Sequence, residues 1–413
     1  MEKQYSGGEI SLGRKLLVLI CVLTLLSEVD GVVSRKELSE VHRRLKMLNK
    51  TPVKTIKSED GEVIDCVDIY KQPAFDHPAL KNHTIQMNPS STNLANTTME
   101  PTTKSATTII PQAWHKHGTC PQGTIPIRRI QMADLLRAPS LDTYGRKNPS
   151  IPDTNANSTK FSRNNILSYL LTTGYSYIGA KAEINLWNPS LESDDEYSSG
   201  QIWLRNGPPQ SYESVEAGWV VNPKVYGDRK TRFFAYWTAD SSKTTGCYDL
   251  TCQGFIQTNH DVALGAYFTP TSQERSYQYQ ISISLHLDPI TGNWWLQFGD
   301  KDLGYWPGEL FSTLRRCASY VMFGGEVYSP NVRKTPHTTA HMGSGDWAEG
   351  LWSQACFIRQ IRIMDYSRSW KFPEWTTKMA DEYYCYNNRY HRDNIFSEPY
   401  FYFGGPGQNM QCP

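Results

Sequence analysis

The feature that most constrains this chain is a long series of short, strand-like segments with no helical pattern between them. From about residue 174 to residue 370, runs rich in Val, Ile, Tyr, Phe and Trp are separated by turn signals. The runs are 176–186, 201–205, 215–222, 231–238, 253–258, 261–269, 277–287, 293–298, 318–328 and 356–364. Aromatic residues make up 12% of the 413 residues, which is typical of strands. The pattern predicts an all-β fold, an antiparallel β-sandwich of two sheets.

The first 160 residues have a different character. Residues 34–48 form an amphipathic helical pattern that begins with a capping box, and 132–138 indicates a second short helix. The stretch 88–110 is rich in Ser, Thr, Asn and Pro and indicates a linker. We therefore expect a small mixed domain over 32–150, followed by the β-sandwich domain over 160–413.

The N-terminus predicts export. Arg14 and Lys15 precede the apolar run Leu16–Leu26, which is short for a membrane span and suits a signal peptide. We expect residues 1–31 to be a cleaved signal peptide, with an uncleaved anchor as the alternative. No later segment reaches eighteen apolar residues, so we expect no membrane contact in the mature protein. The 42 basic and 41 acidic residues nearly cancel, which disfavours a nucleic-acid partner.

Cysteines and glycosylation sequons agree with export. Eight of the nine cysteines lie after the expected signal peptide, and an even number in an exported chain predicts disulfides. Four sequons, all before residue 160, predict glycosylation at Asn49, Asn82, Asn96 and Asn157. Cys247 and Cys252 lack a second thiol pair at zinc spacing, so a tight disulfide is the favoured interpretation.

We expect neither a metal nor another cofactor. His337 and His341 are spaced four apart, but in a segment unsuited to a helix, and His115 and His117 lie in a polar stretch. All four are interpreted as loop residues rather than ligands. The signatures of serine hydrolases, zinc peptidases and nucleotide-binding folds are absent from the sequence.

Two carboxylates in apolar segments remain as candidate catalytic groups. Glu216 lies in 214–221 and Glu326 in 318–328. Two desolvated carboxyl groups can share one proton: one activates water, and the other polarises a carbonyl or protonates a leaving nitrogen. Spacing alone still favours the plainer interpretation that each glutamate is a solvent-facing strand residue.

Several motifs resemble the plant neprosin family. The central ones are Val215–Trp219 and Gly324–Val327, each of which contains one of the two glutamates. Further matching stretches follow in order: Gly179–Ala182, Ile184–Pro189, Gln201–Trp203, Tyr236–Asp240, Gly246–Cys252, Gly254–Asn259, Gly292–Gly299, Gly304–Pro307 and His341–Gly345. In the front part, Ile64–Pro78 and Cys120–Arg129 resemble the activation peptide of that family.

The resemblance implies a secreted glutamic endopeptidase that is made as a zymogen and acts on polypeptides. Its catalytic β-sandwich would use Glu216 and Glu326, and its activation peptide, 32–150, would act as an intramolecular inhibitor. The best-known member prefers to cleave after proline at acidic pH. We assign neither glutamate as base or acid, because a coupled pair titrates as a unit. We expect a monomer in the apoplast or vacuole, activated by cleavage within 145–164.

Disulfide pairing and alternative functions complete the expectations. We expect the pairs Cys66–Cys120, Cys247–Cys252 and Cys385–Cys412, which leave Cys317 with Cys356. A function of another class is a non-catalytic secreted β-sandwich that binds cell-wall polysaccharide or peptide. Glycoside hydrolysis also uses two carboxylates and is a further alternative.

Overall fold

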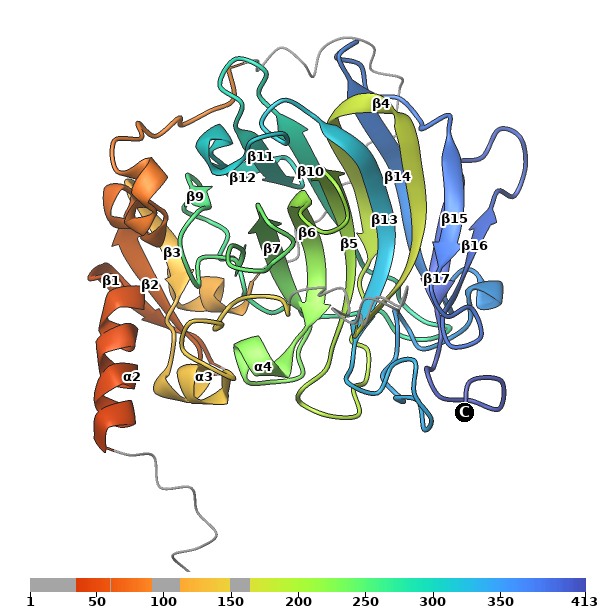
Figure 1. The fold of residues 1–413 in the computed structure, drawn as a ribbon, viewed down its shortest axis with the longest axis horizontal. Coiled ribbons are helices and arrows are strands. Elements are labelled where there is room, and N and C mark those ends of the chain that lie inside the picture. The colour runs from red at the N-terminus through yellow and green to blue at the C-terminus, as the bar shows by residue number, and fades with distance from the viewer. Residues whose placement is uncertain (1–34, 60, 91–111, 149–163) are drawn as a thin grey trace, which may run out of the picture. The chain divides into compact units, whose positions relative to one another are not determined.

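The structure is a computed structural model that describes residues 35–59, 61–90, 112–148 and 164–413 (Figure 1). The expected signal peptide, most of the linker and the sequons at Asn96 and Asn157 lie outside these residues. The chain divides into two compact units, Met1–Arg44 and Leu45–Pro413, and the boundary falls inside helix α2 (Arg35–Leu48). That helix confirms the amphipathic pattern. Within the described ranges, no helix is long and apolar enough to cross a membrane.

A small antiparallel sheet organises the front region, by which we mean residues 45–148. Its strands are β1 (Pro52–Lys57), β2 (Val63–Asp68) and β3 (Thr124–Arg128), in the order β1-β2-β3. Short 3-10 helices connect them: η1 (Ile69–Lys71), η2 (Pro73–Asp76), η3 (Pro78–Leu80) and η5 (Ala113–His117). Helix α3 (Met132–Arg137) follows, where the second helical pattern was expected.

Fourteen further strands form one large antiparallel sheet. They are β4 (Asn165–Asn185), β5 (Tyr197–Asn206), β6 (Glu213–Val221), β7 (Arg232–Thr238), β8 (Cys247–Tyr248), β9 (Ile256–Gln257), β10 (Gln280–Leu287), β11 (Trp294–Phe298), β12 (Lys301–Trp306), β13 (Ala318–Tyr328), β14 (Cys356–Asp365), β15 (Thr376–Ala380), β16 (Asn387–His391) and β17 (Tyr400–Gly404). Three single turns of helix connect some of them: α4 (Pro223–Tyr226), η6 (Gly308–Leu310) and η7 (Ala348–Gly350).

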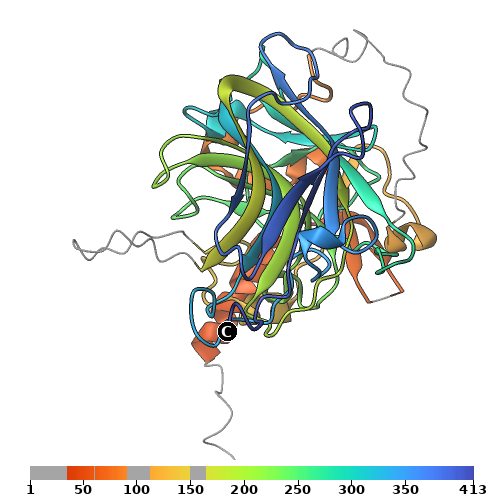
Figure 2. The same cartoon turned by 90° about the vertical axis from the view of Figure 1, so that its right-hand side faces the viewer.

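Strand β4 belongs to two layers at once, which reconciles one sheet with the expected sandwich. Its first half pairs with β13 and β15, and its second half pairs with β10 and β14. The pairing shifts register around Gly174, whose φ of 103° needs a glycine, and such a bulge bends a strand. Figure 1 shows the yellow β4 curving over between the layers, and Figure 2 shows the same bend from the side.

The two layers enclose an apolar core. Strand β6 of the layer β8-β7-β6-β5-β13 contacts β10 of the other layer, and β13 contacts β17. Trp219 on β6 donates its indole N–H to the carbonyl oxygen of Asn185 at the far end of β4, at 2.8 Å. Trp219, Trp294 and Trp306 are fully buried. The predicted sandwich of two antiparallel sheets is therefore confirmed, with β4 as a shared strand.

Most of the predicted strands are present, but one predicted segment is not a strand, and the C-terminal strands β15, β16 and β17 were not predicted. The segment 261–269 forms only isolated bridges, so this prediction was wrong. Strands β15 and β16 were missed because they are polar sequences, Thr376–Ala380 and Asn387–His391, at the margin of the sheet. Period-two hydrophobicity detects strands that bury one face, and it fails for exposed ones.

Three of the four expected disulfides form, and one expectation was wrong. Cys66–Cys120, Cys247–Cys252 and Cys385–Cys412 are bonded, whereas Cys317 and Cys356 are both free thiols. The positions at which β13 and β14 pair with β4 explain why the two thiols do not meet. Ala318 lies opposite Tyr177 on β4, and Ile358 lies opposite Ile184. Seven residues along a strand span about 20 Å, far beyond the Cα separation of a disulfide.

The two sequons that the structure describes differ. Asn82 is exposed, and glycosylation there stays a prediction. The side-chain amide of Asn49 instead donates to the carbonyl oxygen of Ile130, at 2.8 Å, and its oxygen accepts from the Ile130 N–H, at 2.9 Å. A glycan on that nitrogen would have to disturb this pair.

Candidate active site

The two predicted glutamates face the same side of the large sheet, on strands separated by β5. Glu216 on β6 lies opposite Trp203 of β5, and Glu326 on β13 lies opposite Ser199 of β5. Gln201 lies between these two β5 positions and on the same face, because side chains alternate along a strand. Glu216 and Glu326 are both almost completely buried.

The glycines beside this face serve the sheet rather than a ligand. Gly218 on β6 and Gly324 on β13 each lie two residues from one of the glutamates. A Cβ atom on Gly218 would lie 2.1 Å from the carbonyl oxygen of Gly200, and one on Gly324 would lie 2.2 Å from that of Ser168. Glycine is therefore required at both positions by the close approach of neighbouring strands.

A lysine from the front region joins the two glutamates. Lys147 Nζ lies 2.7 Å from Glu216 Oε2 and 2.9 Å from Glu326 Oε2, so these two oxygens are at most 5.6 Å apart. That spacing is within the reach of one bridging water. Only 7% of the Lys147 side chain is exposed. The structure thus brings the two glutamates together at one buried point.

The segment that carries Lys147 is held in place by its backbone. The Tyr248 N–H donates to the carbonyl oxygen of Gly145 at 2.7 Å, and the Lys147 N–H donates to the Tyr236 hydroxyl at 3.3 Å. The stretch 145–164, in which we expect activation cleavage, begins with this held segment, and its residues 149–163 lie outside the described residues. A single lysine in a polar stretch gives no signal that it will enter a site.

Each glutamate also has partners of its own. Glu216 Oε1 accepts from Ser214 Oγ at 2.8 Å and pairs with Arg205 Nη2 at 3.3 Å. Glu326 Oε1 accepts from the Tyr197 hydroxyl at 3.0 Å and from the Asn165 amide. Glu216 therefore has a second cation, whereas the additional donors to Glu326 are neutral.

The side-chain amide of Gln201 lies within hydrogen-bond distance of both glutamates. Its amide nitrogen lies 3.0 Å from Glu326 Oε2 and 3.5 Å from Glu216 Oε2. Its amide oxygen is buried without a hydrogen-bond partner among the residues that the structure describes. Sequence reasoning listed Gln201 only as the start of a matching stretch and assigned neither Gln201 nor Lys147 to the site, because only the register of β5 and the path of a loop place them here.

The charges at this point shift the pKa values in opposite directions. Burial favours neutral Glu326, but the charge and hydrogen bond of Lys147 outweigh burial and lower the pKa of that carboxyl group. Burial also favours neutral lysine, but Glu216 and Glu326 raise the pKa of Lys147 well above its usual value. Glu326 and Lys147 therefore each favour the charged form of the other.

Four aromatic rings surround the lysine nitrogen. Lys147 Nζ lies 5.1 Å from the ring centre of Tyr236, 5.8 Å from Phe234, 5.9 Å from Tyr197 and 6.0 Å from Tyr248. Distances of about 6 Å or less allow cation–π attraction. All four rings belong to the large sheet, so the front region contributes only the cation.

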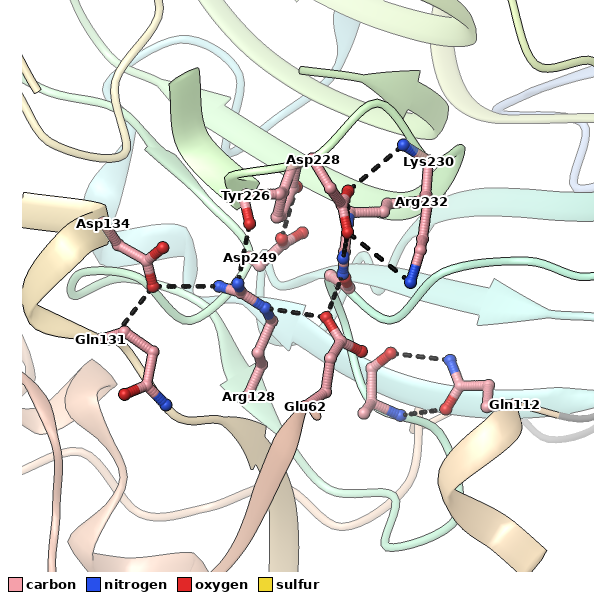
Figure 3. Close-up of polar contacts among 12 residues, drawn as sticks. Glu62, Gln112, Arg128, Gln131, Asp134, Tyr226, Asp228, Lys230, Arg232 and Asp249 are labelled. Carbon is pink, nitrogen blue, oxygen red and sulfur yellow. Dashed lines mark hydrogen bonds and ion pairs between the residues drawn. The ribbon is translucent and has the colours of Figure 1, made fainter. Parts of the chain in front are cut away.

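A second charged contact lies where the small sheet meets β7 (Figure 3). Arg232 at the start of β7 pairs with Glu62 of the front region at 2.5 Å and with Asp228 at 2.7 Å. Arg128 of the front region pairs with Glu62 at 3.1 Å and with Asp134 at 3.5 Å. We call Glu62, Arg128, Asp134, Asp228 and Arg232 the docking cluster.

Buried Asp249 lies behind the docking cluster. Its carboxylate accepts from the Tyr226 hydroxyl at 2.7 Å and from the Ala235 N–H at 3.0 Å. Burial raises the pKa of Asp249 to about 7, although these hydrogen bonds and the cations Arg128 and Arg232 oppose the shift.

Two glutamine side chains of the front region each hydrogen-bond both the N–H and the carbonyl oxygen of one backbone residue, as a neighbouring strand would. Gln72 accepts from the Gln257 N–H at 2.8 Å and donates to the carbonyl oxygen of the same residue at 3.1 Å. Gln112 forms the same pair with Ala263, at 2.8 Å in both directions (Figure 3). These contacts carry no charge.

The histidines are engaged in packing or hydrogen bonds. His337 lies near Cys385 and Cys412, with possible ligand atoms within 4.8 Å of one another. These cysteines form a disulfide, and His337 Nε2 already lies 3.1 Å from Glu382. His115 Nε2 lies 2.6 Å from the carbonyl oxygen of Asp261.

Comparisons with known proteins match nearly the whole described chain. The family described as Neprosin matches residues 194–406, and the Neprosin activation peptide matches residues 55–172. Two solved structures are distantly similar. One is scytalido-glutamic peptidase with a transition-state analogue inhibitor, at 9% identity and a TM-score of 0.32, covering 59% of this chain and 98% of that chain. The other is SCP-B, a member of the Eqolisin family of peptidases, at 9% identity and a TM-score of 0.29, covering 58% and 97%. These two likenesses are too low to carry an argument.

Proposed function

The chain belongs to the neprosin family and carries its activation peptide, and on that premise we propose that it is a secreted glutamic endopeptidase made as a zymogen. Glu216 and Glu326 form the catalytic pair, and the front region is the intramolecular inhibitor. The observation that carries the proposal is that one lysine of the front region reaches a carboxylate oxygen of each glutamate.

Hydrolysis needs the lysine to leave and one proton to be shared by the two carboxyl groups. A water between them attacks the scissile carbonyl carbon and gives a proton to the ionised carboxylate. The protonated carboxyl group polarises the carbonyl and then protonates the leaving nitrogen as the C–N bond breaks. The Gln201 amide, within hydrogen-bond distance of both glutamates, is placed to orient them or the oxygen of the intermediate.

Acid is the condition that removes the block. The lowered pKa of Glu326 means that its ion pair stabilises the latent form above the usual pKa of a glutamate, and that this contribution is lost as pH falls through the lowered value. The raised pKa of Lys147 acts only at alkaline pH, where the lysine would lose its proton. Protonation of Glu326 therefore weakens the hold on the lysine and supplies the one proton that the catalytic pair must share.

The finer features of the proposal follow the family resemblance. Cleavage after proline is supported by the aromatic rings around the site, since a flat ring can pack on a proline. We propose that the protein is a monomer, exported to the apoplast or vacuole, and activated by cleavage within the polar stretch that follows Lys147.

The test is a digestion of a denatured, proline-rich protein at pH 3 to 5, with all new termini mapped by mass spectrometry. We expect cleavage by the unaltered chain and none by Glu216→Gln or Glu326→Gln. Glu183→Gln is the matched control, because Glu183 is a buried glutamate of the large sheet that pairs with Arg359 instead. The residue before each cut reports the proline preference.

Three results would contradict the proposal. Cleavage that persists in either glutamine variant would exclude the pair as catalytic. Activity on glycans instead of peptides would indicate a glycosidase. Retention on cell-wall polysaccharide without any cleavage, unchanged by both substitutions, would indicate the binding protein that the sequence left open.

A further inference from the structure

We infer that the two glutamates and the rings around them form a binding site for an unbranched primary ammonium group, either a free alkylamine or a lysine side chain of a polypeptide. This inference extends the proposed function, on which the catalytic role of the site rests. Binding itself requires only the geometry described above. In the latent chain, Lys147 then fills a site that accepts any unbranched primary ammonium group. Its contact with the glutamates is not specific to the loop that carries it.

The chemistry of the site matches a primary ammonium. Two carboxylate oxygens, one on each of two strands, lie 2.7 and 2.9 Å from Lys147 Nζ and take up two of its three N–H donors. The remaining directions face aromatic rings, the nearest of which is Tyr236 at 5.1 Å. A quaternary, fully methylated nitrogen has no N–H donor and cannot approach two oxygens this closely.

Contacts within the large sheet hold the site in shape. The Tyr236 hydroxyl bonds Ser242 Oγ at 2.7 Å, and the Tyr236 ring packs on that of Tyr248 at 4.9 Å. The Tyr197 ring stacks on Tyr328, with ring centres 5.3 Å apart and planes 9° apart. These contacts lie within the large sheet and hold the rings in addition to the backbone hydrogen bonds that Tyr236 and Tyr248 form with the front region.

Two surface depressions lie beside the lysine and the rings of the site. One surface depression is lined by Tyr144, Lys147, Tyr197, Tyr248 and other residues, and a second is lined by Lys147, Arg205, Tyr212 and Glu326 among others. Both are open to solvent in the latent chain. The second depression is lined by both Lys147 and Glu326, so removal of the Lys147 side chain connects it to the glutamate pair.

The consequence for catalysis is discrimination against lysine. A substrate lysine that enters the site takes the place of the attacking water, so the peptide is held and not cut. This holds while both carboxylates are ionised, and protonation of one of them at acidic pH weakens it. The charged and aromatic groups that face the bound ammonium are Glu216, Glu326, Arg205, Tyr197, Tyr236 and Tyr248.

The experiment uses the full chain with Lys147→Ala, which removes the three outer carbons and the nitrogen, a group that n-propylammonium replaces. Calorimetric titration at pH 7 should show binding of one n-propylammonium per chain and a raised Tm. The neutral isostere n-propanol and tetramethylammonium should bind at least about tenfold more weakly, since hydrogen bonds between charged groups are lost. Adding Glu326→Gln, or lowering the pH to 4, should weaken binding to a similar extent.

Equal binding of n-propanol, or affinity that Glu326→Gln leaves unchanged, would overturn the inference. If the Lys147→Ala chain does not fold, the same titration is made on the unaltered chain after acid treatment and return to pH 6. Failure of the proposed function would appear as ammonium binding without peptide cleavage. Failure of this inference would appear as cleavage without ammonium binding.

Discussion

The front region meets the large sheet through two charged contacts that are built differently. At the glutamate pair, the front region supplies one cation and the sheet supplies both anions. In the docking cluster, each side supplies cations and anions: Glu62 and Arg128 come from the front region, and Asp228 and Arg232 come from the sheet. Both contacts bury their arginine or lysine almost completely.

This difference gives the two contacts different sensitivity to acid. When the glutamates take up protons, Lys147 loses its charged partners and has no other hydrogen-bond acceptor in the described site. In the docking cluster, Arg232 has Asp228 and the carbonyl oxygen of Gly265, at 2.6 Å, as partners besides Glu62. Acid should therefore unblock the active site before it detaches the front region, and the following predictions test that separation.

The largest effect is expected for Lys147→Ala. Breaking a buried ion pair is worth about 3–5 kcal/mol, so activation at pH 6 should become on the order of 100-fold faster. The measurement is the appearance of peptidase activity with time after transfer to each pH. Lys224→Ala is the control, because Lys224 lines the same depression but pairs with exposed Asp195. A variant as latent as the unaltered chain would show that the lysine does not block the site.

Glu62→Gln should weaken attachment and leave the block intact. Arg232 loses one charged partner, which we expect to cost about 2 kcal/mol. The cut front region should then separate from the sheet at higher pH in size-exclusion chromatography, while the pH of activation stays the same. Glu59→Gln is the control, since Glu59 is 61% exposed. A shift in the pH of activation as large as that of Lys147→Ala would mean that the two contacts act as one.

Gln112→Ala should weaken attachment equally at every pH. The variant leaves the Ala263 N–H and carbonyl group unpaired, at a cost of about 1–2 kcal/mol. Because neither group titrates, chemical denaturation at pH 4 and pH 7 should show the same loss. A loss confined to one pH would indicate that the amide acts through the neighbouring charges.

The smallest effect is expected for Asp288→Asn. Burial opposes ionisation of Asp288, but hydrogen bonds from Ser90 and Gln86 of the front region lower its pKa to about 2. A lowered pKa gives stability above the usual value of an aspartate, which is lost only as pH falls through about 2. The contact should thus survive activation, and the variant should lose about 1 kcal/mol at both pH 4 and pH 7 by denaturation. A loss seen only at pH 7 would contradict this.

The features that could be predicted from the sequence are those that patterns of neighbouring residues encode. Segments that alternate buried aromatic or branched residues, such as those of β6 and β13, were expected as strands and are strands. The motif glutamates were named through the family resemblance, and the disulfides within short separations followed from their context. The polar strands β15 and β16 carry no such pattern, and the Cys317–Cys356 pair was inferred only from what remained.

The amino-acid sequence by itself determined the strand-rich architecture and the two glutamates, because periodicity and motif chemistry are written along the chain. Only the tertiary structure decided that Glu216 and Glu326 meet, that Gln201 lies between them and that Lys147 closes the site. Lys147 is 69 residues from Glu216 and 179 from Glu326. Contacts between residues so far apart in the sequence depend on strand register and on the path of the loops. Burial of the core of the whole fold sets both, and no local sequence pattern encodes these contacts.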